Sequence, residues 1–332
     1  MRNVIWPILL LFTLSCGTDI KDRDAQVDVE AGTDTLSSEK ASVNSADSSA
    51  PNSSIDASES DPAYRNLLGY WVGYFEKADD DYEKDVYVDE GFYWNRANKI
   101  NISIDQVVDS QVIGHSVVAG NDRPFKGSIR SLDSQTYEVN VKEPGDDRYD
   151  GEFTFTISAP SADSGQLKGR WTAYQDLDIK HRAYTLEKRD FRYDPKVMLE
   201  KNQSYVDWSR SISETEVYEI DDNEFEEWVT ERFASSTQLI YKLNASKELL
   251  REFEVENLKR GDLLIIRNTI YARHGYSFKN RPLRVFFDAQ SWYIPVHADI
   301  RADFTEIEKE NIQLLLKYEK NAAEYYDYFG RG

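Results

Sequence analysis

A short run between positions 267 and 275 carries the densest pattern of chemically capable side chains in this 332-residue sequence. Arg267, Tyr271 and His274 follow one another at helical spacing, so they would meet on one face of a helix. A guanidinium can bind an anionic group through paired hydrogen bonds, and a histidine can act as a general base. The spacing therefore predicts either recognition of an anion or a catalytic base.

The candidate binding residues are two arginines, one histidine and three aromatic residues: Arg267, Tyr271, Arg273, His274, Trp292 and Tyr293. A structural role is the alternative that we favour, because Arg side chains often bond to loop carbonyls and a histidine can cap a helix end. The Trp and Tyr rings would then form a small core. Catalysis is the least favoured role, because the motif offers His274 neither a nucleophile nor an orienting carboxylate. We predict no catalytic residues.

Signatures of other chemistries are missing from the sequence. There is no Gly-x-Ser-x-Gly, no phosphate-binding Gly-Lys-Ser/Thr loop and no His-Glu-x-x-His, and the four histidines lack metal-ligand spacing. Glu143, Asp146, Asp147 and Asp150 cluster around a turn with a glycine, but the ordered calcium-binding ladder of acids is absent. A solvated hairpin loop is the favoured interpretation there, and we predict no metal and no cofactor.

The segment around the 267–275 run has the pattern of a helical unit. Asp262 would begin a helix that Gly275 stops in the left-handed conformation. Pro282 suits the first turn of the next helix. Thr305 and Glu308 form a capping box for a last helix.

This unit resembles the YARHG domain of bacterial secreted and surface proteins over about residues 249–320. The residues that carry the resemblance are Arg267-Asn268, Tyr271 to Tyr276, Phe278, Leu283, Phe287, Trp292-Tyr293-x-Pro295 and Glu308-Lys309-x-Asn311-Ile312. The resemblance implies an extracytoplasmic helical domain and no reaction. We expect this domain to span residues 246–325.

Residues 63–190 have the alternating pattern of short strands separated by turns. Eight strands are expected: 68–76, 99–108, 111–118, 125–130, 136–142, 151–158, 166–174 and 180–187. That number predicts a closed antiparallel barrel. Gly69-Tyr70-Trp71 resembles the Gly-x-Trp signature of lipocalin-like barrels, which implies that Arg182 or Arg189 stacks on Trp71. Bulky candidates for the interior favour a filled barrel over a ligand carrier.

A second candidate binding surface lies in the expected long loop 77–97. This loop interleaves seven acids with aromatic residues, of which Tyr82, Tyr87, Tyr93 and Trp94 are the candidates for contact with a carbohydrate, a peptide or a cation. The alternative is a loop packed on its own aromatic residues. Beyond the barrel, residues 191–245 are predicted to be a connector with short strands at 216–220 and 238–243.

The first fifteen residues have the pattern of a secretory signal peptide: Arg2, then a short apolar run that is too short to span a bilayer. Leu14-Ser15-Cys16-Gly17 resembles the lipobox of bacterial lipoproteins, which implies cleavage before Cys16 and its acylation with chains such as palmitate. Gly17 and the acids that follow it resemble sorting signals for the outer membrane and cell surface. An ordinary signal peptide with an incidental Cys16 is the alternative.

Residues 16–62 are rich in Ser, Asp, Ala and Glu and show no apolar period, which predicts a disordered acidic tether. The whole chain carries a net charge of −20. Such a surface repels phosphate backbones, so nucleic acid is excluded as a partner.

Together these patterns predict a multidomain α+β protein, with an eight-stranded lipocalin-like barrel followed by a small all-helical domain. The expected function is that of a lipid-anchored envelope or surface lipoprotein, extracytoplasmic and non-enzymatic. Its partner would be an envelope or extracellular protein or a glycan, besides the membrane itself. Two alternatives remain open: a carrier of a small apolar ligand and an envelope hydrolase.

Overall fold

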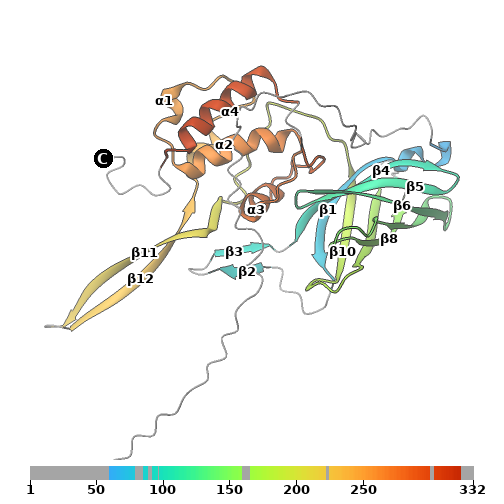
Figure 1. Cartoon of the computed structure of the whole chain (residues 1–332), viewed down its shortest axis with the longest axis horizontal. Coiled ribbons are helices and arrows are strands. Elements are labelled where there is room, and N and C mark those ends of the chain that lie inside the picture. Colours follow the sequence, from blue (N-terminus) through green and yellow to red (C-terminus); the bar gives the residue numbers. More distant parts are fainter. Residues whose placement is uncertain are drawn as a thin grey trace, which may run out of the picture. The chain divides into compact units, whose positions relative to one another are not determined.

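Eight antiparallel strands follow one another between residues 69 and 189 and close into a barrel (Figure 1). The computed structural model describes residues 60–78, 85–88, 92–95, 97–158, 165–221, 224–299 and 303–322. In the barrel, each strand pairs with the barrel strands that precede and follow it along the chain. The strands are β1 (Gly69–Lys77), β4 (Asn98–Val108), β5 (Gln111–Val118), β6 (Asn121–Ser131), β7 (Thr136–Lys142), β8 (Gly151–Ser158), β9 (Gln166–Ala173) and β10 (His181–Arg189). Strand β1 pairs with both β10 and β4, so the predicted closure is confirmed.

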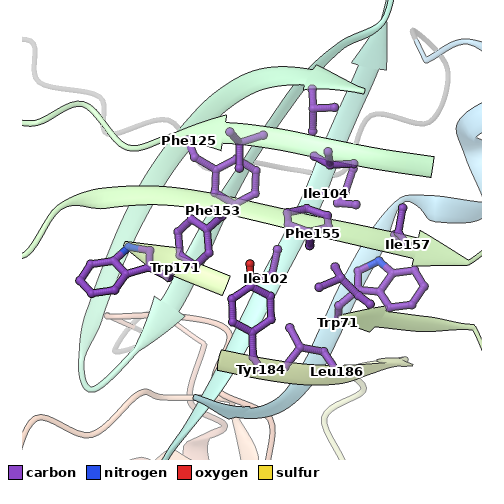
Figure 2. Close-up of a cluster of buried hydrophobic side chains, with 14 of the residues drawn as sticks. Trp71, Ile102, Ile104, Phe125, Phe153, Phe155, Ile157, Trp171, Tyr184 and Leu186 are labelled. Atoms are coloured by element: carbon purple, nitrogen blue, oxygen red, sulfur yellow. The ribbon is translucent and has the colours of Figure 1, made fainter. Parts of the chain in front are cut away.

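The barrel interior is filled with apolar side chains (Figure 2). Alternation along each strand places one face inward, and β8 alternates buried and less buried residues along its whole length. Phe75, Phe153 and Trp171 form part of an aromatic cluster whose ring centroids lie 5.6–6.5 Å apart. Figure 2 shows Trp71 and Trp171 at opposite sides of this cluster. This packing favours the filled barrel over a ligand carrier.

The 3-10 helix η2 (Pro62–Leu67) lies next to Trp71. The Trp71 indole N–H donates to the Leu67 carbonyl at 2.9 Å. The cation over the Trp71 ring is Lys188, 5.9 Å from the centroid. The expectation that Arg182 or Arg189 stacks there was wrong, because Lys188 is the residue directly opposite Trp71 in the β1–β10 register. Arg182 instead lies over Phe75, at 5.1 Å.

The expected long loop 77–97 contains a two-stranded hairpin of β2 (Asp85–Val88) and β3 (Phe92–Asn95). Tyr87, Tyr93 and Trp94 belong to these strands. Tyr82 and the side chains of all four candidates lie outside the described residues. Their binding role stays a prediction.

The region expected to be a connector holds a long antiparallel ribbon, formed by β11 (Val206–Asp221) and β12 (Glu224–Ser235) (Figure 1). The short strand expected at 216–220 is part of β11. The strand expected at 238–243 was wrong, because η3 (Gln238–Tyr241) is a 3-10 helix whose first turn is capped by Thr237. The Thr237 hydroxyl accepts from the Leu239 N–H, which favours a helical turn over a strand.

The helical part consists of α1 (Glu252–Val255), α2 (Arg260–Arg273), α3 (Arg281–Asp288) and α4 (Glu306–Glu319). Gly275 has φ +80°, the left-handed geometry that was predicted to end the helix. Pro282 lies in the first turn of α3, and Thr305 and Glu308 form the predicted capping box of α4. Asp262 lies in the first turn of α2, two residues after the helix begins.

All described residues belong to one compact unit, and the barrel wall meets the helical part along a seam. We define the seam as Val72, Tyr74 and Lys99 of the barrel together with residues 288–296. Lys99 lies on the outer face of β4, and its ammonium donates to the carbonyls of Gln290 and Tyr293 at 2.7 and 3.2 Å. Its backbone N–H donates to the Asp288 carboxylate at 2.8 Å. Burial lowers the pKa of Lys99 to about 8 and raises that of Asp288 to about 6.

Within the described part of the chain, no helix combines the length and the apolar character needed to cross a membrane. The expected signal peptide, Cys16 and residues 16–59 of the expected tether lie outside the described residues. The tether was wrong for residues 60–62, because Ser60 is buried and the Asp61 N–H donates to the Val107 carbonyl at 2.8 Å.

Candidate functional site

Helix α2 presents Arg267 and Tyr271 toward the end of α4. The Arg267 guanidinium donates twice to the Glu319 carboxylate, at 2.9 and 3.1 Å. The same guanidinium lies over the Tyr271 ring, 5.6 Å from its centroid. Both charged side chains are largely buried, so the fork-like geometry that could bind an external anion is already occupied by a carboxylate of this chain.

His274 ends α2 and forms a buried pair with the capping glutamate of α4. Its Nε2 lies 2.8 Å from Oε2 of Glu308, whose side chain is fully buried. The Tyr193 ring stacks on the imidazole at 4.2 Å, and its hydroxyl donates to Oε1 of Glu308 at 2.9 Å. Phe304 covers another side of the imidazole in an edge-to-face contact. An acid–base pair is therefore present, but it lies beneath aromatic side chains.

Hydrogen bonds decide the charge state of Glu308. Burial opposes ionisation of this carboxyl group, but the hydrogen bonds from His274, Ser246 and the Thr305 backbone outweigh burial and hold its pKa below the ordinary value. An ionised Glu308 can accept from all these donors at once. The pair thus joins the end of α2 to the start of α4.

Arg273 ties the chain before the ribbon to the helices. Its Nε and Nη2 donate to the Val197 carbonyl at 3.0 and 2.8 Å, and its Nη1 donates to the Ser246 hydroxyl at 3.0 Å. Burial lowers its pKa to about 10, which leaves it charged at neutral pH. The guanidinium satisfies a carbonyl of an irregular segment, which is the structural role that the sequence offered as an alternative.

Trp292 and Tyr293 lie where the helical part meets the barrel. Tyr293 is buried, its hydroxyl donates to the Tyr276 carbonyl at 2.7 Å, and the Lys99 ammonium lies 5.6 Å from its ring centroid. Trp292 packs against the helical core and is partly buried. Arg267 lies over Tyr271, and Tyr271 and His274 both contact Phe304. Arg273, Trp292 and Tyr293 contact other parts of this chain, so the six candidates do not form one binding site among the described residues.

Comparison with known proteins bears on this helical part. Residues 236–320 match the family model of the YARHG domain. This segment is a YARHG domain. No curated protein and no solved structure matches the chain significantly. The match begins one residue after β12 ends, so the ribbon lies outside the YARHG domain and immediately before it.

Within the YARHG domain, the residues of the motif hold its parts together: Arg267 links α2 to α4, His274 links α2 to the α4 cap, and Arg273 binds the preceding segment. The binding role predicted for them stays a prediction. Lys99 and Asp288, which sequence analysis missed, fix the YARHG domain to the barrel. The only signal for Lys99 was a charged residue within the apolar run of β4.

Glu143, which the sequence placed in a solvated loop, is buried at one end of the barrel. Its Oε2 accepts from the Gly151 N–H at 2.7 Å and the Trp171 indole at 3.1 Å, and its Oε1 accepts from Ser116 at 3.2 Å. Burial raises the pKa of Glu143 to about 7, although the hydrogen bonds from Trp171 and Gly151 oppose the shift. The solvated-loop expectation was wrong for this residue.

Asp150, from the same acidic cluster, is also buried, and it pairs with Arg123 at 3.1 Å. Its other carboxylate oxygen accepts from the Gly145 N–H at 2.8 Å. Asp146 and Asp147 are exposed, as expected of a loop. Among the described residues, no three metal-ligating side chains come together as an ion site requires.

Proposed function

We propose that this protein is a lipid-anchored lipoprotein of the bacterial envelope or surface that acts as a non-enzymatic binding module. A YARHG domain joined to a closed β-barrel favours a non-catalytic binding module. The lipobox-like sequence around Cys16 and the acidic composition of residues 16–62 support the anchor and the tether. The anchor would hold the module at the membrane, and the tether would let it reach a partner.

One observation carries the binding role: exposed apolar side chains gather on the ribbon of β11 and β12. Val217, Tyr218, Ile220, Phe225, Trp228 and Val229 each expose between 51% and 62% of their surface. A two-stranded ribbon is at best marginally stable in water by itself. Apolar side chains gathered on one exposed element are typical of an interaction site.

Two other functions have weaker support. The aromatic packing inside the barrel disfavours a carrier of an apolar ligand. The buried position of His274 and Glu308 beneath Tyr193 and Phe304 disfavours a hydrolase built on that pair. The binding module therefore remains the function that the described geometry supports best.

The anchor is tested by fractionation of cells that express the full chain or its Cys16→Ala variant. We expect the natural chain in the membrane fraction and the variant in the soluble fraction; retention of the variant in membranes would overturn the anchor. The binding role is tested by pull-down from envelope and extracellular extracts with the full chain. We expect specific retention of a partner, and a mock-like profile would contradict the binding role.

A further inference from the structure

We propose that the ribbon of β11 and β12 docks a cationic segment of another protein, in which Lys or Arg side chains alternate with apolar ones. This inference rests on the proposed function and names the chemistry of the partner. It is carried by the charge of the ribbon, by the placement of its apolar side chains and by its unpaired edges.

The ribbon carries a large excess of acidic over basic residues. Residues 206–235 contain ten acids and two arginines, within a chain whose net charge is −20. Both arginines already have carboxylates close by: Arg232 lies 2.9 Å from Glu214, and Arg210 lies 3.8 Å from Asp207. Exposed glutamates such as Glu219, Glu226 and Glu227 remain to meet a partner's cations. The ribbon thus presents an excess of negative charge to solvent.

Each exposed aromatic residue of the ribbon stands beside a glutamate. In the β11–β12 register, Tyr218 is opposite Glu226, Glu216 is opposite Trp228, and Glu219 is opposite Phe225. Residues that are directly opposite share a face of the sheet, with Cβ atoms about 5 Å apart. The pairs Tyr218–Glu226 and Glu216–Trp228 lie on one face of the ribbon, and Glu219–Phe225 lies on the other face together with Val217–Glu227. A complementary surface must therefore offer apolar contact and positive charge at the spacing of a strand.

The edges of the ribbon give such a segment a place to bind. Among the described strands, β11 and β12 pair only with each other, so each has an outer edge of backbone N–H and C=O groups. An extended segment can add to such an edge through main-chain hydrogen bonds, with alternate side chains supplying specificity. A third strand also makes a two-stranded ribbon substantially more stable.

The base of the ribbon fixes its position on the YARHG domain. Tyr205 is buried, and its ring makes an edge-to-face contact with Phe286 of α3. The Ser236 N–H donates to the Tyr205 carbonyl at 3.2 Å, which closes the base. Ala234 is buried, whereas the apolar residues farther along the ribbon are exposed. The domain therefore anchors one end of the ribbon, and the remainder is presented to a partner.

Charge also excludes three other occupants. A second copy of this chain would bring Glu-rich strands side by side, and like charges that face each other across strands are destabilising. An anionic lipid surface and a nucleic acid would be repelled by the same carboxylates. A cationic protein segment satisfies both the apolar and the charged features of the ribbon.

The test measures binding of a capped nine-residue peptide of alternating lysine and valine to the purified full chain in a mild non-ionic detergent. Peptides of alternating glutamate and valine, and of alternating lysine and serine, serve as probe controls. We expect the Lys–Val peptide to bind at least about tenfold more tightly than either control, with an affinity that falls as salt rises. Equal affinity for the Lys–Val and Glu–Val peptides would overturn the proposal.

Two variants and their matched controls locate the site. The double variant Phe225→Ala, Trp228→Ala should weaken binding of the Lys–Val peptide about tenfold or more. The control is Leu249→Ala, Phe253→Ala, which removes similarly exposed apolar side chains outside the ribbon and should leave this binding unchanged. Glu219→Lys, Glu226→Lys and Glu227→Lys together should reduce the preference for the Lys–Val peptide over the Glu–Val peptide about tenfold or more. Asp176→Lys, Glu187→Lys and Glu310→Lys together, at exposed positions outside the ribbon, should leave the preference unchanged. An identical response of ribbon and control variants would contradict the assignment.

Sedimentation and vesicle binding address the other occupants. If the natural chain forms a dimer that the Phe225→Ala, Trp228→Ala variant does not form, the occupant of the ribbon is a second copy of this chain. If the natural chain binds phosphatidylglycerol vesicles and this variant does not, the occupant is a lipid surface. Either result would overturn the proposal. If the ribbon variant still retains the partner captured from envelope extracts, the ribbon assignment fails while the proposed binding function stands. Failure of the natural chain to retain any partner would count against both.

Discussion

The barrel and the ribbon both consist of antiparallel strands, but the barrel buries its apolar side chains whereas the ribbon exposes many of its own. In β8 of the barrel, Phe153, Phe155 and Ile157 alternate with less buried residues and all three enter the core. In β11 and β12, Val217, Phe225 and Trp228 each follow an acid and stay exposed. Closure gives each barrel strand two neighbours and one inner face, whereas among the described strands β11 and β12 pair only with each other.

This difference shows that alternation of apolar and polar residues predicts a strand but does not predict what packs against its apolar side chains. A barrel strand is covered by other strands of the same chain. The ribbon combines apolar surface with charge, and the charge opposes self-association of its exposed edges. Apolar burial therefore stabilises the barrel, while the same residue types in the ribbon would contribute to binding.

The largest expected effect contrasts two tryptophans. Trp71→Ala should lower the free energy of unfolding by about 3–5 kcal/mol, because it leaves a cavity in the barrel core and an unpaired Leu67 carbonyl. Chemical denaturation followed by circular dichroism measures the change. A loss below about 1 kcal/mol would show that the barrel core is less tightly packed than described.

A second effect contrasts a buried carboxyl group with an exposed one. Because the pKa of Glu143 is raised to about 7, the folded protein keeps a proton that the unfolded chain has released, so stability falls as pH rises from about 4.5 to 7. Glu143→Gln should remove up to about 3 kcal/mol of this decline. The glutamine oxygen can still accept from Gly151 and Trp171, and its amide can donate to Ser116.

Denaturation curves between pH 4 and pH 8 measure the decline for Glu143→Gln. Glu227→Gln in the ribbon, where the side chain is exposed, is the matched control and should leave the pH profile as it is. A parallel profile for the natural chain and Glu143→Gln would contradict the assignment of the decline to Glu143.

A third effect concerns the turn that ends α2. Gly275→Val should cost about 2–3 kcal/mol, because φ is +80° and a Cβ would lie 3.1 Å from both Phe191 and Val296. Gly145→Val is the control: its φ is +86°, but its nearest neighbour is Tyr174 at 3.6 Å, so only the backbone strain applies. Equal melting temperatures for the two variants would show that crowding at Gly275 is unimportant.

The smallest expected effect on stability belongs to the ribbon. Trp228→Ala should change the free energy of unfolding by less than about 0.5 kcal/mol, because the side chain is 60% exposed. The same substitution should weaken partner binding. A destabilisation comparable to that of Trp71→Ala would mean that Trp228 is covered within this chain, and it would remove the contrast between the two regions.

Much of the fold followed from sequence because local rules decide it. The alternation of apolar and polar residues predicted the eight barrel strands. The capping box of Thr305 and Glu308 predicted the start of α4, and Gly275 predicted the end of α2. Contacts between distant residues could not be found in this way. Lys188 rather than an arginine lies over Trp71 because of the strand register, which the sequence does not display.

The candidate site shows the same division. Helical spacing correctly placed Arg267, Tyr271 and Arg273 in one helix, with His274 as its cap. The partners Glu319, Val197 and Glu308 lie 52, 76 and 34 residues away in the sequence, so no local pattern pointed to them. The ribbon was expected only as a short strand at 216–220, because the acidic run 221–227 interrupts the apolar alternation by which a second strand could be recognised.

The seam has a mechanical consequence. If the proposed lipid anchor and the proposed partner at the ribbon both hold the chain, a pull between them would pass from the barrel wall to the YARHG domain through the seam. The contacts that would carry the load are the Lys99 bonds to Gln290 and Tyr293 and the Tyr74 hydroxyl bond to the Asp288 carbonyl. Val72, Ile294 and Val296 form a small buried apolar cluster at the same seam. Under that proposal, part of the load would cross from β1 and β4 to residues 288–296 through side-chain bonds, in parallel with the backbone that joins the barrel to the YARHG domain.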